Sequence, residues 1–363
     1  MARFSAAVGG LEVRAGTPED RSAVAALFAR AEPEIPLARE AFGRLWEWLH
    51  FHAPGRTSDV FVAGKGDDDL RGHVAMLPVP FACEDTPLTA GWPCELMVDD
   101  RARGTLLYPV MVQQLLRLCK THDYAFAYAL INRPRVLAAN IALGLKPIGE
   151  LPVWVRPYRP MAMLPKAFAT PAARLAARLL GPLDALLRLR PPGAARAVSI
   201  ESIARFTPEI DELFARTLSP AFRFVALRTS ERLNWRFFGA ERTYHVIVAR
   251  AAGRIVGYAA LRVMPMRAYR ALAVVDLWHD PAEPAAGRGL MREVHRFALA
   301  EQVDFAACLM APHSPMAGLL REHWFGKSPE SFTLTVYQPR REMPYGGTPL
   351  TDWHPTWFDH DYV

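Results

Sequence analysis

The chain contains one pattern of strands and helices twice, offset by 181 residues, the separation of Glu95 from Asp276. Three further pairs of similar residues keep this offset: Leu96 and Leu277, Asp99 and Asp280, and Tyr124 and Phe305. These positions span an acidic strand, a turn, a helix and a buried strand. A fixed offset across elements of different type indicates a duplicated structural unit. The sequence therefore predicts the same α/β unit in two copies.

Hydrophobic periodicity predicts the elements of each copy. In the first copy, residues 94–99 and 124–130 have the composition of strands, and residues 106–122 between them carry apolar side chains at helical spacing. In the second copy, residues 271–280 and 305–310 are strand-like, and residues 289–302 are helical. Strands that alternate with helices are typical of an α/β fold.

Length and composition set the broad class. The chain has 363 residues, enough for two domains that each bury a hydrophobic core. Its 51% hydrophobic and 22% charged residues are typical of globular proteins. The net charge of +6 suits anionic ligands such as nucleotide sugars, acidic carrier proteins or lipid headgroups. Because no nucleic-acid-binding motif accompanies this charge, we expect no nucleic-acid partner.

Neither metal nor disulfide chemistry is expected. The four cysteines lack C-x-x-C spacing, and the eleven histidines lack H-x-x-x-H and H-E-x-x-H patterns. We expect reduced, mostly buried thiols, and His50 and His52 exposed at a helix end. The first residues have no apolar core for a signal peptide, and no stretch reaches the roughly 18 apolar residues of a membrane span. The expected location is the cytoplasm.

Residues 98–109, VDDRARGTLLYP, connect a predicted strand to a predicted helix. The N-terminus of a helix presents backbone N–H groups and positive dipole charge to an anion. Arg101 and Arg103 add positive side chains, and Gly104 allows a close approach of the backbone. The turn therefore suits a phosphate group, and a solvated basic turn is the alternative.

The order of these motifs resembles the GNAT acyltransferase fold. Residues 128–158, YALINRPRVLAANIALGLKPIGELPVWVRPY, resemble the end of the first domain in a tandem branch of that family, and residues 233–250 match its second domain. The resemblance covers roughly residues 11–160 and 200–340. It implies two tandem GNAT-like α/β domains, each a mixed, mostly antiparallel twisted sheet flanked by helices. It also implies transfer of an acyl group from acyl-CoA to an amine.

The resemblance implies a donor site in the first copy. The family's loop R/Q-x-x-G-x-G/A holds the CoA pyrophosphate, and the best register puts Arg103 at its first position. The residues expected to bind acetyl-CoA or another acyl-CoA are Leu96, Met97, Val98, Arg101, Arg103, Gly104, Thr105, Leu106 and Asn132. Backbone N–H groups of residues 96–98 would polarise the thioester carbonyl, and Asn132 would face the pantetheine arm.

Glu95 and its counterpart Asp276 are the candidate catalytic residues. Acyl transfer to an amine needs a base that removes a proton from the ammonium group. Both carboxylates lie on the strand that the family uses at its reaction centre. A strand-edge salt bridge is the alternative role for each.

The sequence departs from the family's motifs at several positions. Leu106 and Tyr108 occupy the glycine positions of the loop, and Asn140 occupies the position of the family's general-acid tyrosine. In the second copy, residues 284–294, PAAGRGLMREV, keep two glycines but begin the motif with Ala286.

The expected organisation has four parts. Residues 1–160 form the GNAT-like domain that binds acyl-CoA, and residues 161–198 form a basic, leucine-rich connector. Residues 199–345 form the second GNAT-like domain, and residues 346–363 form a C-terminal tail.

The connector contains six basic residues and one acid among leucine, alanine and proline, with helices expected near residues 172–180 and 183–190. We expect it to contact a membrane surface, at the inner face, or an acidic carrier protein. An apolar helix packed between the domains is the alternative.

The expected function is transfer of an acyl group, with acetyl expected, from acyl-CoA to the amine of a small molecule or an amino sugar. Two alternatives remain. One is a Fem-type aminoacyl transferase that uses aminoacyl-tRNA. The other is a catalytically inactive tandem GNAT that serves as a ligand sensor or scaffold.

Overall fold

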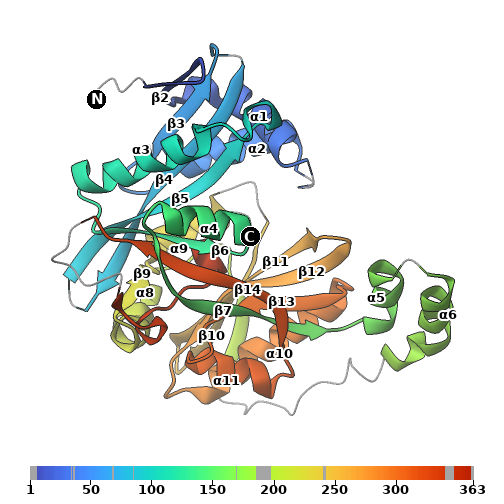
Figure 1. Cartoon of the computed structure of the whole chain (residues 1–363). Coiled ribbons are helices and arrows are strands. Elements are labelled where there is room, and N and C mark those ends of the chain that lie inside the picture. Colours follow the sequence, from blue (N-terminus) through green and yellow to red (C-terminus); the bar gives the residue numbers. More distant parts are fainter. Residues whose placement is uncertain are drawn as a thin grey trace. The chain divides into compact units, whose positions relative to one another are not determined.

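The structure is a computed structural model, and it describes residues 6–33, 35, 37–67, 69–84, 86–168, 170–184, 198–239, 243–339 and 347–360. The chain divides into two compact units, both mixed α/β (Figure 1). Unit 1 comprises Met1–Gly149, Gly239–Arg242 and Thr333–Leu350. Unit 2 comprises Glu150–Phe238, Thr243–Phe332 and Thr351–Val363.

Unit 1 is built on a sheet with the strand order β1-β2-β3-β4-β5-β6-β14. Its strands are β1 (Ala6–Val8), β2 (Leu11–Ala15), β3 (Asp59–Gly64), β4 (Leu70–Cys83), β5 (Thr86–Val98), β6 (Phe126–Ile131) and the end of β14 (Gly326–Tyr337). Its helices are α1 (Arg21–Ala31), α2 (Arg39–Phe51), α3 (Leu107–Thr121) and α4 (Pro134–Ala142). The β5–β6 pair is parallel, and the other described pairs are antiparallel.

Helices cover both faces of this sheet. Neighbouring residues of a strand point to opposite sides, so two consecutive residues of β4 contact helices on the two faces. At Gly72 of β4, a Cβ atom would lie 2.7 Å from Met111 Sδ and 3.0 Å from Leu107 Cδ2, so α3 lies directly on that face. The next residue, His73, accepts a hydrogen bond from Trp46 of α2 on the other face.

Unit 2 is built on a sheet with the strand order β7-β13-β12-β11-β10-β8. Its strands are the end of β7 (Lys146–Pro157), β8 (Ser199–Ser202), β10 (His245–Ala251), β11 (Arg254–Met266), β12 (Tyr269–His279) and β13 (Phe305–Leu309), with the short β9 (Phe224–Ala226) off this path. Its helices are α5 (Pro160–Ala167), α6 (Pro171–Leu180), α8 (Glu209–Leu213), α9 (Ser230–Phe238), α10 (Pro284–Ala300) and α11 (Pro315–Glu322). The β12–β13 pair is parallel, as its counterpart in unit 1 is.

Each unit contains the last strand of the other repeat. β7 follows α4 along the chain, but its residues 153–157 pair with β13 of unit 2. β14 follows α11, but its residues 333–337 pair with β6 of unit 1. The two-domain α/β fold expected from the sequence is confirmed, whereas the expected domain limits stay predictions. The expected domains are contiguous ranges of the sequence, so they do not include this exchange of strands.

The connector and the C-terminal segment have structure of their own. α5 and α6 lie in the predicted connector, and the second helix expected there, near residues 183–190, lies largely outside the described residues. The C-terminal segment packs into unit 2 through the buried side chains of Trp353, Trp357 and Phe358. No helix in the described ranges is long and apolar enough to span a membrane.

Candidate active site

The central strands of both units have a β-bulge where the two parallel strands separate. In unit 1, β5 pairs with β6 at Ala90–Phe126 and Gly91–Ala127 and then continues to Val98 without further pairing to β6. The register between β4 and β5 shifts in the unpaired part, where Glu95 and Leu96 of β5 oppose a single residue of β4. A gap between two parallel strands is where the resemblance to the GNAT fold places the thioester of the donor.

In unit 2, the pairing of β12 with β13 ends at Val274–Cys308, and the register with β11 shifts directly after it, before Asp276. The bulge of unit 2 is at Val275, directly before Asp276, whereas Glu95 is itself a bulge residue of unit 1. The 181-residue offset found in the sequence therefore brings Glu95 and Asp276 to similar places, each within one residue of the bulge of its strand.

Glu95 lies at the bulge with a left-handed backbone conformation, φ +51°. A non-glycine residue pays roughly 1–2 kcal/mol for this conformation. The bulge turns its side chain towards α2, and the residue is only 4% exposed. Strain of this kind often accompanies a functional side chain, because the bulge re-aims that side chain.

Glu95 belongs to a chain of buried polar groups. Its Oε2 lies 2.9 Å from His50 Nε2, and His50 Nδ1 lies 2.9 Å from Ser58 Oγ. An ionised Glu95 accepts from His50 Nε2–H, and His50 Nδ1 then accepts from the Ser58 hydroxyl. The expectation that His50 is exposed is wrong, because α2 packs on the sheet and buries the side chain completely.

His73 completes the polar cluster and is held neutral. Trp46 Nε1 donates to its Nε2 at 2.8 Å, and its Nδ1 donates to the backbone oxygen of Glu95 at 2.7 Å. The indole can only donate and the carbonyl can only accept, so the tautomer follows from the two partners. Burial lowers the pKa of His73 to about 4. This ring braces the bulge from β4.

His50, His73 and Glu95 could bring three ligand atoms within 4.8 Å of one another, close enough for a metal ion. The hydrogen bonds oppose such use, because the Trp46 N–H already occupies the lone pair of His73 Nε2. The absence of a metal cofactor stays a prediction, and the geometry favours a hydrogen-bonded cluster.

The turn before α3 presents backbone donors to its exterior. The N–H groups of Arg101, Arg103, Thr105 and Leu107 are occupied by acceptors within the turn. Those of Gly104, Leu106 and Tyr108 have no acceptor among the described residues. These three residues alternate with those whose N–H groups are occupied. They lie in the segment that corresponds to the loop whose N–H groups bind the CoA pyrophosphate in the GNAT family. Gly104 has φ +81°, the conformation that its missing side chain permits.

The two arginines of this turn differ in availability. Arg101 makes two hydrogen bonds to the buried carboxylate of Asp99, at 2.9 and 2.7 Å. Arg103 pairs with Asp100, and both side chains are largely exposed, at 59% and 71%. Exposed ion pairs are weak and exchange readily. Arg103 is therefore the better candidate for a phosphate ligand, and Arg101 fixes the shape of the turn.

Tyr108 takes part in a contact that the sequence did not suggest. Its hydroxyl donates to Asn140 Oδ1 at 2.8 Å and so connects the first turn of α3 to α4. Burial raises the pKa of the Tyr108 phenol to about 12, so the hydroxyl keeps its proton at neutral pH. A tyrosine hydroxyl thus lies beside Asn140, the position where the family has a tyrosine.

The remaining predicted donor residues lie around the gap. Leu96 and Val98 pack partly buried against the core beneath α3, while Met97 is buried. Asn132 is exposed directly after β6. Thr105 Oγ1 accepts from the N–H of Leu107, the first residue of α3, at 3.2 Å. Leu106 is 70% exposed. Ligand contacts for these residues stay predictions.

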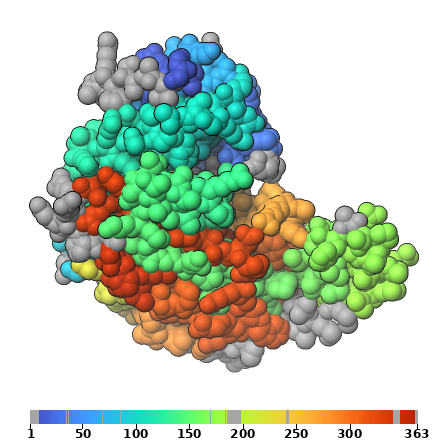
Figure 2. All heavy atoms as spheres, viewed as in Figure 1, coloured from blue at the N-terminus to red at the C-terminus, as the bar shows by residue number. Residues whose placement is uncertain are grey.

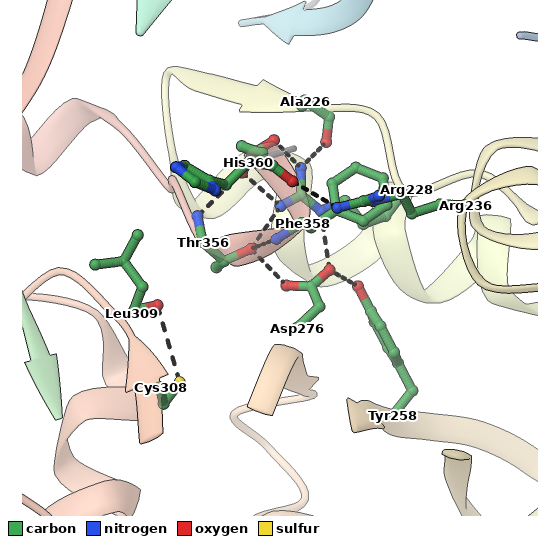
Figure 3. Close-up of polar contacts among 11 residues, drawn as sticks. Ala226, Arg228, Arg236, Tyr258, Asp276, Cys308, Leu309, Thr356, Phe358 and His360 are labelled. Carbon is green, nitrogen blue, oxygen red and sulfur yellow. Dashed lines mark hydrogen bonds and ion pairs between the residues drawn. The ribbon is translucent and has the colours of Figure 1, made fainter. Parts of the chain in front are cut away.

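Asp276 belongs to a buried polar network of unit 2 (Figure 3), and its hydrogen-bond partners differ in kind from those of Glu95. Its Oδ1 accepts from Thr356 Oγ1 at 3.0 Å, and its Oδ2 accepts from Tyr258 at 2.6 Å and from Arg228 Nε at 3.2 Å. Arg228 also donates to both oxygens of Asp359, at 3.2 and 2.9 Å. Every one of these side chains is buried. Asp276 therefore anchors the C-terminal segment, and its predicted role as a base finds no support in this geometry.

The glycines of the second copy are required for packing. A Cβ atom at Gly287 would lie 2.5 Å from His279 Nε2, and one at Gly289 would lie 2.9 Å from Ile200 Cδ1. Both positions are buried in the first turns of α10. The GRG sequence thus lets α10 approach its neighbours closely, and it need not bind phosphate.

No family model and no curated protein matches this sequence. Among solved structures, the chain is similar to Saccharomyces cerevisiae N-myristoyltransferase with bound myristoyl-CoA and inhibitors, at 14% identity and TM-score 0.65, covering 96% of this chain and 85% of that one. It is also similar to a tandem GNAT protein from the clavulanic acid biosynthesis pathway, at 16% identity and TM-score 0.59, covering 91% and 99%. A GCN5-related N-acetyltransferase from Anabaena variabilis matches at 11% identity and TM-score 0.62, covering 91% and 73%. The chain has the GNAT fold in tandem, as its sequence motifs indicated.

Proposed function

We propose that this tandem GNAT protein is an N-acyltransferase that moves an acyl group from acyl-CoA to an amine, with the donor bound by unit 1. One coincidence carries the proposal. The gap between β5 and β6, the strained Glu95 at its bulge and the three N–H groups at the start of α3 all occur in the same copy. A thioester in the gap would meet backbone donors, and its pyrophosphate would meet the N-terminus of α3.

Unit 1 is favoured over unit 2 by the state of its charged groups. The carboxylate of Glu95 has a histidine partner, whereas Asp276 is paired with an arginine. The two oxygens of Asp276 already accept from Arg228 and from two hydroxyl groups, so this carboxylate is poorly placed to take a proton from an amine. The carboxylate of Glu95 is almost completely buried. Before the acceptor amine can lose a proton to it, the amine has to come within hydrogen-bonding distance, directly or through one bridging water.

Arg103→Glu is expected to weaken CoA binding at least about tenfold, because an attractive contact to the pyrophosphate becomes repulsive. Calorimetric titration with CoA measures the affinity, and salt should reduce the difference. Arg288→Glu in the first turns of α10 of unit 2 is the matched control and should bind CoA normally. Loss of affinity in Arg288→Glu with none in Arg103→Glu would move the donor site to unit 2.

For the acyl group we propose acetyl. Trp92 and Tyr128 directly follow the last paired residues of β5 and β6, and their rings stack with centroids 6.4 Å apart. Phe81 contacts Tyr128 at 5.2 Å. All three are buried, and their rings pack together next to the closed end of the gap. A long acyl chain would have to displace these rings.

We therefore expect acetyl-CoA to have a kcat/KM at least about tenfold above that of myristoyl-CoA, since displacing packed aromatic rings costs several kcal/mol. Steady-state kinetics with a panel of small amines and amino sugars measures this. A preference for the long chain would contradict the acetyl assignment and leave acyl transfer itself intact.

The aminoacyl-tRNA alternative has less support. Fem-type enzymes carry a long helical hairpin in the second half. In the described part of unit 2, the longest helix is α10, of 17 residues, and it packs on the sheet. A thermal shift with tRNA and none with acetyl-CoA would favour that alternative.

A further inference from the structure

Helices α5 and α6 form a small layer of unit 2 whose outer surface is both apolar and basic. In Figure 1, α6 lies on the far side of α5 from the sheet, and Figure 2 shows this green to yellow-green segment standing out from the orange and red parts of the same unit. We name the exposed side chains Arg174, Leu175, Arg178 and Leu179 the outer face of α6.

The outer face follows from the helical spacing of the sequence. Ala173, Ala176 and Ala177 are partly buried, and they form the inner face, at spacings of three and four residues. Two parallel stripes remain on the other side, Arg174 with Arg178 and Leu175 with Leu179. Small residues inside and large ones outside are the reverse of a helix that packs its apolar side into a core.

The apolar side chains of this layer are strongly exposed. Leu175 is 58% exposed and Leu179 is 67% exposed. Leu180, the last residue of α6, is 43% exposed, and Phe168, which follows α5, is 60% exposed. Single exposed apolar residues are ordinary, but a contiguous group on one short helix indicates an interaction surface.

Hydrogen bonds and an ion pair hold α5 and α6 in place, so the outer face of α6 has a defined position within unit 2. The N–H of Met161 at the start of α5 donates to Asp184 Oδ1 at 3.0 Å, and Lys166 forms an ion pair with Asp304 of unit 2. At the start of α6, Thr170 Oγ1 accepts from the N–H of Ala173 at 3.2 Å, and Pro171 occupies the first helical position.

The exposed charge of the layer is positive. Between residues 160 and 184 the one acidic side chain is Asp184, which is 5% exposed and already bonded to Met161. Neither Arg174 nor Arg178 has a carboxylate partner among the described residues. The outer face therefore combines exposed leucines with arginines that have no carboxylate partner among the described residues. Such a face is complementary to a surface with negative charge on the outside and an apolar layer below it.

We propose that the outer face of α6 binds the surface of an anionic lipid bilayer. Leu175 and Leu179 enter the boundary between headgroups and acyl chains, while Arg174 and Arg178 extend to the lipid phosphates with their aliphatic stems alongside. A convex helix with an apolar stripe fits a deformable interface, and it needs no matching groove. The helix is ten residues long and lies in the plane of the interface. This binding does not depend on acyl transfer.

The test is cosedimentation of the full chain with vesicles of phosphatidylcholine, with and without phosphatidylglycerol. We expect binding to the anionic vesicles, weaker binding at high salt, and none to the neutral vesicles. Leu175→Ser with Leu179→Ser should weaken binding at least about tenfold, and so should Arg174→Glu with Arg178→Glu. The matched control is Arg254→Glu with Arg267→Glu, which makes the same charge change on exposed residues of unit 2 and should bind normally.

Thermal melting of each variant checks the fold, which these exposed substitutions should not disturb. Equal binding by the outer-face variants and the unchanged chain overturns the proposal. No binding to anionic vesicles overturns it as well. If light scattering then shows a dimer that the leucine variants make monomeric, the outer face contacts a second copy. If an acidic protein competes for it instead, the occupant is that protein.

Discussion

Glu95→Gln is expected to lower kcat by about a hundredfold or more with acetyl-CoA and a competent amine, at nearly unchanged affinity for CoA. Glutamine keeps the size of the side chain, and its oxygen still accepts from His50, so the buried cluster stays intact. It removes the basicity that takes the proton from the amine. The deficit should shrink at high pH, where the free amine needs no base. Steady-state kinetics across pH together with CoA titration measure both parts.

Asp276→Asn is the paired variant, since it makes the same chemical change at the equivalent position of the repeat. We expect its kcat to stay close to that of the unchanged protein whenever the variant is folded. Full activity in Glu95→Gln with lost activity in Asp276→Asn would reverse the roles of the two units. If neither substitution changes kcat, the enzyme works by positioning a deprotonated amine.

Arg228→Met is expected to destabilise the protein by about 3–5 kcal/mol at neutral pH, because it leaves two buried carboxylates without their cation. Arg228 binds Asp276 and Asp359, and its guanidinium carbon lies 4.1 Å from the ring centre of Phe358. Burial already raises the pKa of Asp359 against the opposing effect of Arg228. Urea unfolding measures the change.

The pH dependence of this destabilisation has a definite sign. Removing Arg228 removes the effect that opposes burial at Asp359, so the pKa of Asp359 rises further in the folded state and the folded variant binds a proton that the unfolded chain does not. Its stability relative to the unchanged protein should therefore recover as the pH falls from 7 towards 5.

Arg267→Met breaks the exposed pair with Glu330 and should cost at most about 1 kcal/mol. It is the matched control for Arg228→Met. An equally small loss in Arg228→Met would mean that the buried network does not hold the C-terminal segment.

Several features of the site were predictable because they depend on nearby residues. The strand, turn and helix around Arg103 follow from periodicity within about twenty residues, as does the donor-rich N-terminus of α3. The register of the repeat predicted that Glu95 and Asp276 occupy equivalent positions, and both lie at a bulge beside a gap. Local spacing also predicted α6, which spans Pro171–Leu180.

Other features depend on partners that are distant along the chain. His50 reaches Glu95 across 45 residues, and Thr356 reaches Asp276 across 80. No local pattern marked His50 as buried, since α2 reads as an ordinary amphipathic helix and the residue lies near its end. No local pattern predicted the contact of Tyr108 with Asn140 either, because it joins two different helices.

The sequence by itself determined that the chain is a duplicated α/β protein with a basic strand–helix turn and two equivalent acidic residues, because short-range periodicity and a constant offset express these properties. Only the tertiary structure decided how the two copies differ. In this structure the last strands of the two repeats are exchanged. β7 pairs with β13 of the second repeat, and β14 pairs with β6 of the first. It placed a histidine beside Glu95 and an arginine beside Asp276, and a carboxylate's chemistry depends on the charge that packs against it.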